Sequence, residues 1–396
     1  MFFAFLSVAV GLLGGVAPVH QEKPSTSLNA LSPKEIEQGW IQLFDGTTTF
    51  GWQARGGAEW KIMDGTVKGT SPQTGMGMLC TTSEFGDFEL HVEAQIDPEA
   101  NSGIMLRAPV AGDITADNSY EVNIYDKHEK WPTGSINNIQ RTKRKVKSVE
   151  RWIAFDVVAD GDHLVVKIDG KKTVDAKDSK HQRGVIALQS WGVGSIAFRN
   201  VRLKPLGGKS LFNGKDLSNW HPIPNQKSVY SVTPEGYLNI KNGSGEIQTE
   251  SEWGDFILQL EIFSNGEHLN SGVFFREDAG AFWGGYESQI RNHWMGDDRT
   301  KAVDYGTGGL YNRQAARRVV SNDREWFTMT VLAHGTHFAI WVNGYQTANV
   351  VDERPEKASA RQGRRTKAGV IGLQGHDPTT DLSFRNIRAV ELPKAE

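Results

Sequence analysis

The chain has 396 residues, long enough for two or three domains that each bury a core of their own. Hydrophobic residues make up 38% and charged residues 23%, a composition that excludes a disordered or membrane-embedded polypeptide. The formal net charge of -3 argues against a nucleic-acid partner. Cys80 is the only cysteine, so no intrachain disulfide can form and a zinc site built on several cysteines is excluded.

An apolar, uncharged segment from Phe2 to Val16 opens the chain. It is too short for a membrane span and predicts a signal peptide over residues 1–19, so we expect export to the periplasm or the extracellular space and no stable membrane span. An uncleaved N-terminal anchor is the alternative. Residues 20–38 are expected to form a linker with one short helix, because Ser32-Pro33-Lys34-Glu35 has the spacing of a capping box.

Beyond residue 38 the patterns are typical of β-strands. Residues 88–96 alternate strictly between apolar and polar side chains, as a half-buried antiparallel strand does. Residues 152–158 and 163–168 predict a hairpin across Asp160-Gly161, and the same pattern returns at 326–342. Two antiparallel sheets packed face to face are therefore the expected architecture of each domain.

The strongest signal in the sequence is the repeat of a whole domain. Leu43-Phe44-Asp45-Gly46 returns as Leu211-Phe212-Asn213-Gly214, and Phe85-Gly86-Asp87-Phe88 returns as Trp253-Gly254-Asp255-Phe256. Both pairs of motifs are 168 residues apart, and further landmarks follow in the same order. Such a pattern indicates duplication of one large unit and not a solenoid of short repeats.

The two copies are predicted to span residues 39–206 and 207–396, with the boundary near Pro205. The repeat and the strand patterns together predict an all-β chain of two tandem jelly-roll sandwiches. Late landmarks lie further apart than early ones, so the second copy has longer loops, which we expect mainly between Ile290 and Gly306. Long loops are where sandwiches elaborate their binding sites.

One predicted strand of the second copy, residues 286–291, carries alternating polar side chains that would share one face. Glu287 and Gln289 lie on that face, and Glu121 is the counterpart of Glu287 in the first copy. Such a face suits the wall of a sugar cleft. An ordinary solvent-exposed face fits the strand pattern equally well.

Arg276 and Arg107 each end the apolar strand that precedes this one in their copy. A guanidinium there could pair with the neighbouring glutamate, hold a substrate oxygen, or do both. The predicted face offers a single carboxylate, so glycoside hydrolysis by two carboxylates is disfavoured unless Asp304 or Asp377 approaches from a loop. Trp283 lies outside the strand pattern, where an indole could stack on a sugar ring, although tryptophans are more often packing residues.

Several motifs of the second copy, taken in order, resemble the 3-keto-disaccharide hydrolase domain family. They are Leu211 to Trp220, Trp253 to Phe256, Asn270 to Arg276, Gly285 to Ile290, Thr307 to Tyr311, Gly369 to Gln374 and Phe384 to Arg388. The resemblance covers both copies and implies a concanavalin A-like sandwich fold. It is more specific for the fold and the family than for the reaction.

The resemblance implies an exported enzyme that cleaves 3-keto-glycosides, including 3-keto-disaccharides. A ketone at C3 acidifies the proton on C2, so one base can form an enolate and the glycosidic oxygen can leave before water adds. This route needs a cation or a metal for the enolate and a proton donor for the leaving oxygen, but no second carboxylate nucleophile. A divalent metal is therefore a candidate cofactor, with no ligands assigned.

The site residues suggested by the resemblance and the strand patterns lie mainly in the second copy. The candidate catalytic residues are Glu287, Arg276 and His376, and the candidate carbohydrate-binding residues are Gln289, Tyr311, Gln374, Trp283, Arg107 and Glu121. In the first copy Asn123, Asn137 and Ser190-Trp191 depart from the family pattern. This copy is therefore expected to be a binding or structural partner of the second and not a second catalytic unit. A non-catalytic carbohydrate-binding protein of the cell envelope and an ordinary endoglycanase are the alternatives.

Overall fold

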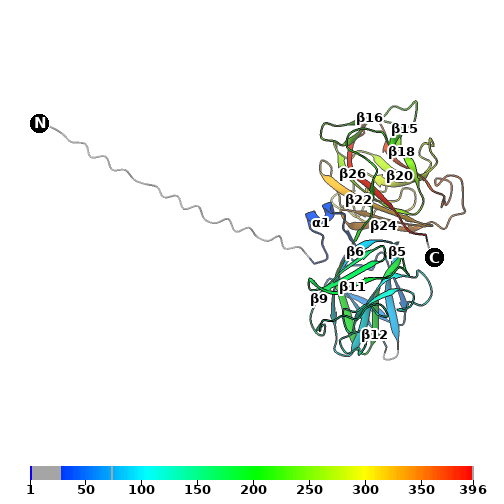
Figure 1. The fold of residues 1–396 in the computed structure, drawn as a ribbon. Coiled ribbons are helices and arrows are strands. Elements are labelled where there is room, and N and C mark those ends of the chain that lie inside the picture. The colour runs from blue at the N-terminus through cyan, green and yellow to red at the C-terminus, as the bar shows by residue number, and fades with distance from the viewer. Residues whose placement is uncertain (2–27, 73–74, 395–396) are drawn as a thin grey trace.

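The structure, a computed structural model, describes residues 1, 28–72 and 75–394 of the chain. These residues form four antiparallel sheets and one short helix, arranged as two β-sandwiches that lie one above the other in Figure 1. The predicted all-β architecture of tandem sandwiches is therefore confirmed. The signal peptide predicted over residues 1–19 lies outside the described residues except for Met1. No helix in the described part of the chain is long and apolar enough to cross a membrane.

The first half of the chain forms one sandwich. Its larger sheet runs in the order β11 (Lys171–Lys177), β10 (His163–Ile168), β9 (Ile153–Asp160), β6 (Phe88–Ile96), β13 (Ser195–Pro205), β4 (Thr66–Thr70) and β3 (Glu59–Met63), with β1 (Ile41–Gln42) paired to β13. Its smaller sheet runs β2 (Trp52–Gly56), β5 (Met76–Phe85), β12 (Gly184–Gly192), β7 (Ala100–Ala108) and β8 (Tyr120–Ile124). Every second side chain of β6 is buried, because only one face of that strand meets the core.

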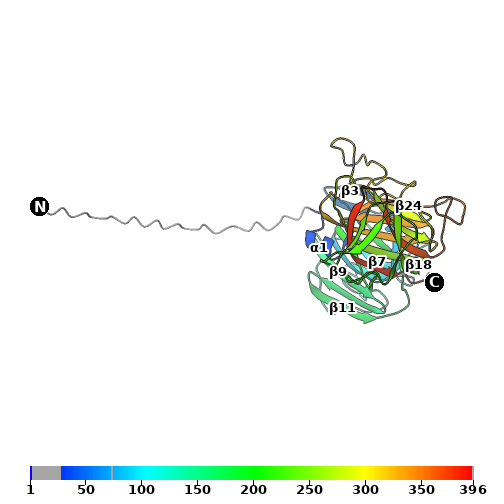
Figure 2. The same ribbon diagram turned by 90° about the horizontal axis from the view of Figure 1, so that it is seen from above.

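The second half repeats this arrangement. Its larger sheet runs β16 (Val229–Val232), β17 (Leu238–Lys241), β26 (Asp381–Glu391), β19 (Phe256–Ser264), β22 (Trp326–His334), β23 (His337–Val342) and β24 (Tyr345–Val351), with β14 (Lys209–Ser210) paired to β26. Its smaller sheet runs β15 (Trp220–Pro222), β18 (Gly245–Trp253), β25 (Gly369–Gly375), β20 (Ser271–Glu277) and β21 (Tyr286–Ile290). Figure 2 shows the two sandwiches from above, with strands of both overlapping in the view.

The first half also covers the outer face of the larger sheet of the second half. Ile257, Leu332 and Trp341, from β19, β22 and β23, belong to the apolar cluster of the first half. All of β23 and nearly all of β19 are therefore buried on both faces, unlike β6. The two sandwiches thus share a continuous apolar contact.

The predicted helix is present as α1 (Pro33–Glu37), immediately before the first sandwich. Ser32 and Glu35 exchange hydrogen bonds at its start, so the predicted capping box is confirmed. The last turn of the helix is followed by Gln38, whose carbonyl accepts a hydrogen bond of 3.4 Å from Arg388 in the second half.

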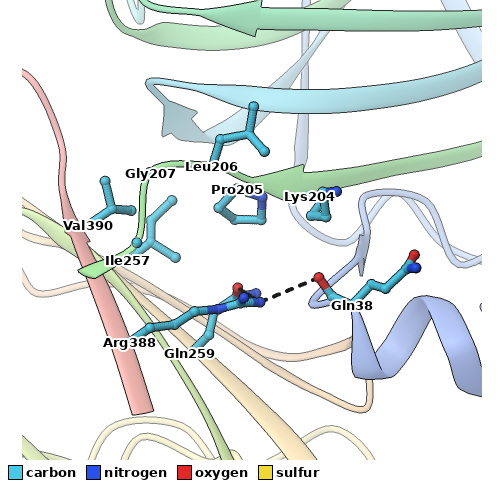
Figure 3. A pocket seen from close by; sticks show the side chains of 10 residues that line it. Gln38, Lys204, Pro205, Leu206, Gly207, Ile257, Gln259, Arg388 and Val390 are labelled. Carbon is cyan, nitrogen blue, oxygen red and sulfur yellow. Dashed lines mark hydrogen bonds between the residues drawn. The ribbon is translucent and has the colours of Figure 1, made fainter. Parts of the chain in front are cut away.

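The segment after α1 continues along the second half before it enters the first sandwich. The carbonyl of Gly39 accepts a hydrogen bond of 2.8 Å from Gln259, and that of Gln42 accepts one of 3.0 Å from Trp341. A cavity of about 270 Å³ lies between Gln38, the connection 204–208 and β26, as Figure 3 shows. The N-terminal segment therefore contacts both sandwiches.

Two connections add the most residues to the second half relative to the first. The β21–β22 connection spans residues 291–325, against 125–152 for β8–β9. The β24–β25 connection spans residues 352–368, against 178–183 for β11–β12. The expectation that the extra length lies mainly between Ile290 and Gly306 is therefore wrong, because the larger insertion is at 352–368.

Candidate active site

The smaller sheet of the second half has polar side chains on the face turned away from the sandwich core. Ile247, Val273, Tyr286 and Leu373 belong to the core cluster, and side chains alternate along a strand, so their neighbours lie on the opposite face. We call this opposite face the polar face. It consists of Glu246 and Gln248 on β18, Gly372 and Gln374 on β25, Gly272 and Phe274 on β20, and Glu287 and Gln289 on β21.

Glu287 lies at one end of a row of residues that crosses the polar face. It is opposite Phe274, which is opposite Gly372, which in turn is opposite Gln248. Neighbouring strands are about 4.8 Å apart, so the row is about 14 Å long. The sequence indicated only the β21 end of this row, because sequence alone does not show which strands are neighbours.

The carboxylate of Glu287 is folded over Gly272 of the neighbouring strand and is only 5% exposed. The guanidinium of Arg361 donates a hydrogen bond of 2.6 Å to its Oε2 atom. Burial raises the pKa of Glu287, and the ion pair with Arg361 opposes that rise without cancelling it. A raised pKa brings a carboxylate toward the range in which a general base works well at neutral pH.

Arg361 is the cation of this site, and no sequence motif pointed to it. It belongs to the β24–β25 insertion, where the first copy offers no counterpart. Its Nε donates a hydrogen bond of 2.9 Å to the carbonyl of Trp283, and its guanidinium carbon lies 4.8 Å from the centre of the Tyr311 ring. Arg361 therefore links the ring of Tyr311, the backbone of Trp283 and the carboxylate of Glu287.

The predicted contact between Arg276 and Glu287 is wrong. Arg276 is fully buried and donates to the carbonyls of Gly254 (2.9 Å) and Arg365 (3.1 Å) and to the carboxylate of Asp255 (2.9 Å). A bulge in β20 gives Arg276 a φ of 52° and turns its guanidinium toward the core ring of Phe338, away from the polar face. Its role is to hold the turn at Gly254-Asp255.

Arg107, predicted to bind carbohydrate, has the same structural role in the first half. It is buried, has a φ of 51°, and donates to the carbonyl of Gly86 (2.9 Å) and the carboxylate of Asp87 (2.7 Å). The repeated Gly-Asp motif is thus the partner of the repeated arginine. The sequence shows both motifs, but it does not show the bulge that brings them together.

Two carboxylates that sequence reasoning missed, Glu246 and Glu277, also lie on this side of the sheet, so the expectation of a single carboxylate is wrong. Neither has any exposed surface, and Nε2 of Gln248 donates to both, at 3.0 and 3.2 Å. Burial raises the pKa of Glu246 to about 10, and the neighbouring Glu277 adds to the rise. A comparison of the two copies could have drawn attention to Glu246, because the first copy has the apolar Met78 at the same position of the repeat.

Three amide side chains at the polar face have buried oxygens with no partner among the described residues. They are Gln289, Gln374 and Asn270. Gln289 is held by a hydrogen bond of 2.9 Å from its Nε2 to the carbonyl of Asp304, which leaves its Oε1 free. Buried acceptors normally find a donor, and the hydroxyl groups of a sugar can supply one.

Aromatic rings lie around the Glu287–Arg361 pair. The rings of Trp283 and His376 are stacked, 5.7 Å apart at 10°. His376 is 36% exposed, and its Nδ1 hydrogen-bonds to Asp377 at 2.9 Å. With Arg361 in place of Arg276, the predicted residues of the second copy are therefore brought together.

The corresponding face of the first half keeps Asn123 and Gln189, but it is apolar where the second half has its two further glutamates and Gln248. The repeat and the sheet register place Met78, Cys80 and Ala108 where the second half has Glu246, Gln248 and Glu277. These three residues form a small buried cluster that includes Ile114 from the β7–β8 connection. This half therefore has no acidic or amide side chain at these three positions.

Glu121 is the buried counterpart of Glu287 in the first half. It accepts a hydrogen bond of 2.8 Å from Asn137, and burial raises its pKa. The short β11–β12 connection supplies no arginine to it, whereas the longer connection of the second half supplies Arg361.

The described residues contain no group of three or more His, Cys, Asp or Glu side chains that could hold a metal ion. The divalent metal suggested by the resemblance stays a prediction.

Comparison with known proteins places both halves in one family. A family model described as a 3-keto-alpha-glucoside-1,2-lyase-like domain matches residues 39–204 and 207–389. A comparison with curated proteins gave no match. Among solved structures, a candidate glycosyl hydrolase from Parabacteroides distasonis is 18% identical, with a TM-score of 0.42 over 46% of this chain and 100% of that one. A carbohydrate binding module from Bacillus subtilis is 24% identical, with a TM-score of 0.31 over 38% of this chain and 94% of that one.

Proposed function

Since the chain belongs to the 3-keto-alpha-glucoside-1,2-lyase-like domain family through both of its halves, we propose that it cleaves 3-keto-glycosides at the polar face of its second half. Family membership supports an action on carbohydrates. The oxidised substrate and the cleavage route belong to the proposal. So does export to the periplasm or beyond, which the apolar segment Phe2 to Val16 supports.

One observation carries the proposal: a buried carboxylate–guanidinium pair, Glu287 and Arg361, lies beside unpaired amide oxygens in the second half, and the first half has no such pair. The amide oxygens suit sugar hydroxyl donors, and the rings of Trp283 and Tyr311 suit the apolar face of a pyranose. The cation, the base and the sugar-binding groups therefore share one surface.

The chemistry follows from the acidity that a ketone at C3 gives to the proton on C2. Glu287 takes that proton, and the electron pair passes into the enolate, whose oxygen Arg361 stabilises by a charge-assisted hydrogen bond. The enolate then expels the glycosidic oxygen from C1, which forms the C1–C2 double bond. Water adds across this bond, so the net products are a free 3-keto sugar and an alcohol.

The leaving oxygen needs a proton, and His376 is the candidate donor. Asp377 accepts a hydrogen bond from its Nδ1, which orients the ring, as a carboxylate partner does for histidine. His376 is also the most exposed of the three candidate catalytic groups, Glu287, Arg361 and His376. A histidine at this position therefore stays within reach of solvent protons.

Replacing Glu287 with glutamine tests the proposal. Glu287→Gln keeps the size and hydrogen bonding of the side chain and removes its basicity, so kcat on a 3-keto-disaccharide should fall on the order of 100-fold or more. Glu121→Gln is the matched change in the first half and should leave the rate unchanged. The free sugar released over time from the 3-keto-disaccharide and from its unoxidised parent gives the measurement.

The possible outcomes separate the alternatives. Full activity of Glu287→Gln together with loss in Glu121→Gln would place catalysis in the first half. Cleavage of the unoxidised parent would point to an ordinary glycosidase. Saturable binding of either sugar without any product would support the non-catalytic carbohydrate-binding protein.

A further inference from the structure

Glu246 and Glu277 are two buried glutamates that no step of the proposed reaction uses. Glu246 lies on β18 and Glu277 at the end of β20, both without exposed surface. Gln248 lies between them, and its Nε2 donates to Oε1 of Glu246 and to Oε2 of Glu277. Buried acids without a salt-bridge partner are costly to fold, so their presence calls for a reason.

These three side chains hold the β20–β21 connection, residues 278–285, by its backbone. Glu277 accepts hydrogen bonds from the amides of Gly284 and Gly285, and Glu246 accepts one of 3.3 Å from the amide of Trp283. Gln248 accepts one of 2.8 Å from the amide of Gly280 and donates one of 2.8 Å to the carbonyl of Ala281. Most of the connection is therefore attached to buried side chains of the sheet.

The connection held in this way reaches the candidate active site through Trp283. Its carbonyl accepts the hydrogen bond from Nε of Arg361, and Arg361 pairs with Glu287. Its ring stacks on His376. A change at Glu246 or Glu277 would therefore move Trp283. Trp283 contacts both Arg361, which pairs with the proposed base Glu287, and His376, the proposed acid.

The carboxyl groups of Glu246 and Glu277 lie 3.0 and 3.2 Å from the same nitrogen, Nε2 of Gln248. Two buried carboxylates held together in this way cannot both be ionised without a cation between them. The other ionisable groups that face the pair are Tyr230, which adjoins Glu246, and Arg365, which adjoins Glu277 and is itself paired with Asp278. Burial raises the pKa of Glu246 to about 10 and raises that of Glu277 as well. The pair therefore keeps one proton at neutral pH, and the two carboxyl groups share it in a hydrogen bond.

We propose that Glu246 and Glu277 share one proton and act as a positioning pair, which fixes residues 278–285 and thereby sets Trp283 and Arg361 around Glu287. The effect on turnover rests on the proposed function, whereas the shared proton and the fixed connection do not. The first half, with Met78, Cys80 and Ala108 at these positions, has no such pair.

Two single substitutions distinguish the partners. Glu246→Gln imitates the protonated acid, since an amide N–H can still donate to Glu277. Glu277→Gln removes the charged acceptor of two backbone amides. In hydrogen–deuterium exchange at pH 7, Glu246→Gln should keep the protection of residues 278–285 within about threefold of the wild type, whereas Glu277→Gln should lower it about tenfold or more.

Glu252→Gln is the matched control, because it makes the same chemical change at an exposed position of the same strand, and it should alter nothing. If the proposed function holds, kcat/KM should fall about tenfold in Glu277→Gln and little in Glu246→Gln. Equal protection in the wild type and Glu277→Gln would overturn the positioning role. If only Glu287→Gln loses turnover while both exchange results are as expected, the pair still fixes residues 278–285. Its link to catalysis would then be overturned.

Stability as a function of pH tests the shared proton without any substrate. The folded state keeps a proton that the unfolded chain releases above the ordinary pKa of 4.5, so wild-type stability falls as the pH rises from there toward 10. Glu246→Gln has no such proton. From pH 6 to 9 the ratio of the wild-type unfolding constant to that of Glu246→Gln should therefore rise about tenfold per pH unit, and parallel curves would overturn the proposal.

Discussion

Gly272 determines where the carboxylate of Glu287 can lie. A β-carbon at this position would come within 2.5 Å of Oε1 of Glu287. In the first half, a β-carbon at Gly103 would lie 2.9 Å from Oε1 of Glu121. The glycine of the repeated Asn-Ser-Gly motif is thus explained by the space that a neighbouring glutamate needs. The serine of the motif is explained by its hydrogen bond across the sheet, which Ser271 donates to the carbonyl of Gln374 at 2.6 Å.

Substituting this glycine tests the position of Glu287 without touching its chemistry. Gly272→Ala should push the carboxylate off the sheet, weaken its ion pair with Arg361 and lower kcat/KM about tenfold or more, because small misplacements of a catalytic group are costly. Gly103→Ala makes the matched change in the first half and should leave kcat/KM unchanged. Equal effects of the two substitutions would show that the loss reflects folding alone.

At the scale of single residues, the sequence predicted which side chains lie at the site more reliably than it predicted which of them contact one another. Glu287 and Gln289 were predicted from alternation along one strand, and the structure puts both on the polar face. Arg276 was assigned to the same face, but the bulge beside it reverses its direction, and no residue type announces that bulge. Glu246 was missed because its strand joins the polar face only through sheet pairing.

The β24–β25 connection, residues 352–368, is the element that most distinguishes the second half. Arg354 braces it with a hydrogen bond of 2.7 Å to Asp352 and further bonds to the carbonyls of Ala360 and Gly363. Arg365 ties it to Asp278 of the β20–β21 connection. These contacts hold the segment that presents Arg361 to Glu287.

Removing the charge of Arg361 should change the pH dependence of the reaction. Arg361 lowers the pKa of Glu287, so in Arg361→Met the effect of burial is opposed less and the pKa rises further. Since a base must be deprotonated to act, the acid limb of the kcat/KM profile should move to higher pH, in addition to a fall in rate. Arg361→Lys should restore part of the shift.

Arg364→Met, from the same connection, is the control and should leave the profile in place. An unchanged acid limb in Arg361→Met would show that Glu287 is not the group that titrates there.

The place of this insertion could have been found from the sequence. The hairpin at His163 returns at His337, 174 residues later, whereas Gly184 returns at Gly369, 185 residues later. Most of the added length therefore follows the hairpin. The connection's own course could not be predicted, because it has neither strand alternation nor a counterpart in the first copy.

At the scale of the whole molecule, the two sandwiches are joined by a buried polar network as well as by apolar contact. Arg183, whose side chain is 4% exposed, donates to Glu84 at 2.9 Å in its own half. It also reaches the second half, through the carbonyl of Pro393 and a contact of 2.7 Å with Nε2 of His334, while Asp255 lies 3.5 Å away. Burial lowers the pKa of His334, which suits a ring that accepts from an arginine.

Arg183→Met should weaken the attachment of the halves. Removing one partner of a buried ion pair costs about 3–5 kcal/mol, and the remaining Glu84 then has no strong cation beside it. Calorimetry at pH 7.5 should show a lower Tm and separate transitions for the two sandwiches. Arg151→Met, which removes an exposed pair with Asp169, should change the free energy of unfolding by no more than about 1 kcal/mol. Equal Tm values for the two variants would contradict this role.

The network should also respond to acid. The folded-state pKa of His334 is lower than that of the unfolded chain, so its contribution to stability is present above about pH 6.5 and is lost as the pH falls below that value. The repeat predicted both sandwiches but not how they pack, since the sequence does not show that Ile257, Leu332 and Trp341 face the other half.

The N-terminal segment has a consequence for the order in which the chain can fold. Gln42 is made before either sandwich, but its partner Trp341 follows 299 residues later. At a synthesis rate of about 5–20 residues per second, roughly 15–60 s pass before that contact can form. The first sandwich can close on the ribosome, while the segment ahead of it has no surface to pack against until the second half is made. Release of the full-length chain, and not completion of the first sandwich, is therefore the event that finishes folding.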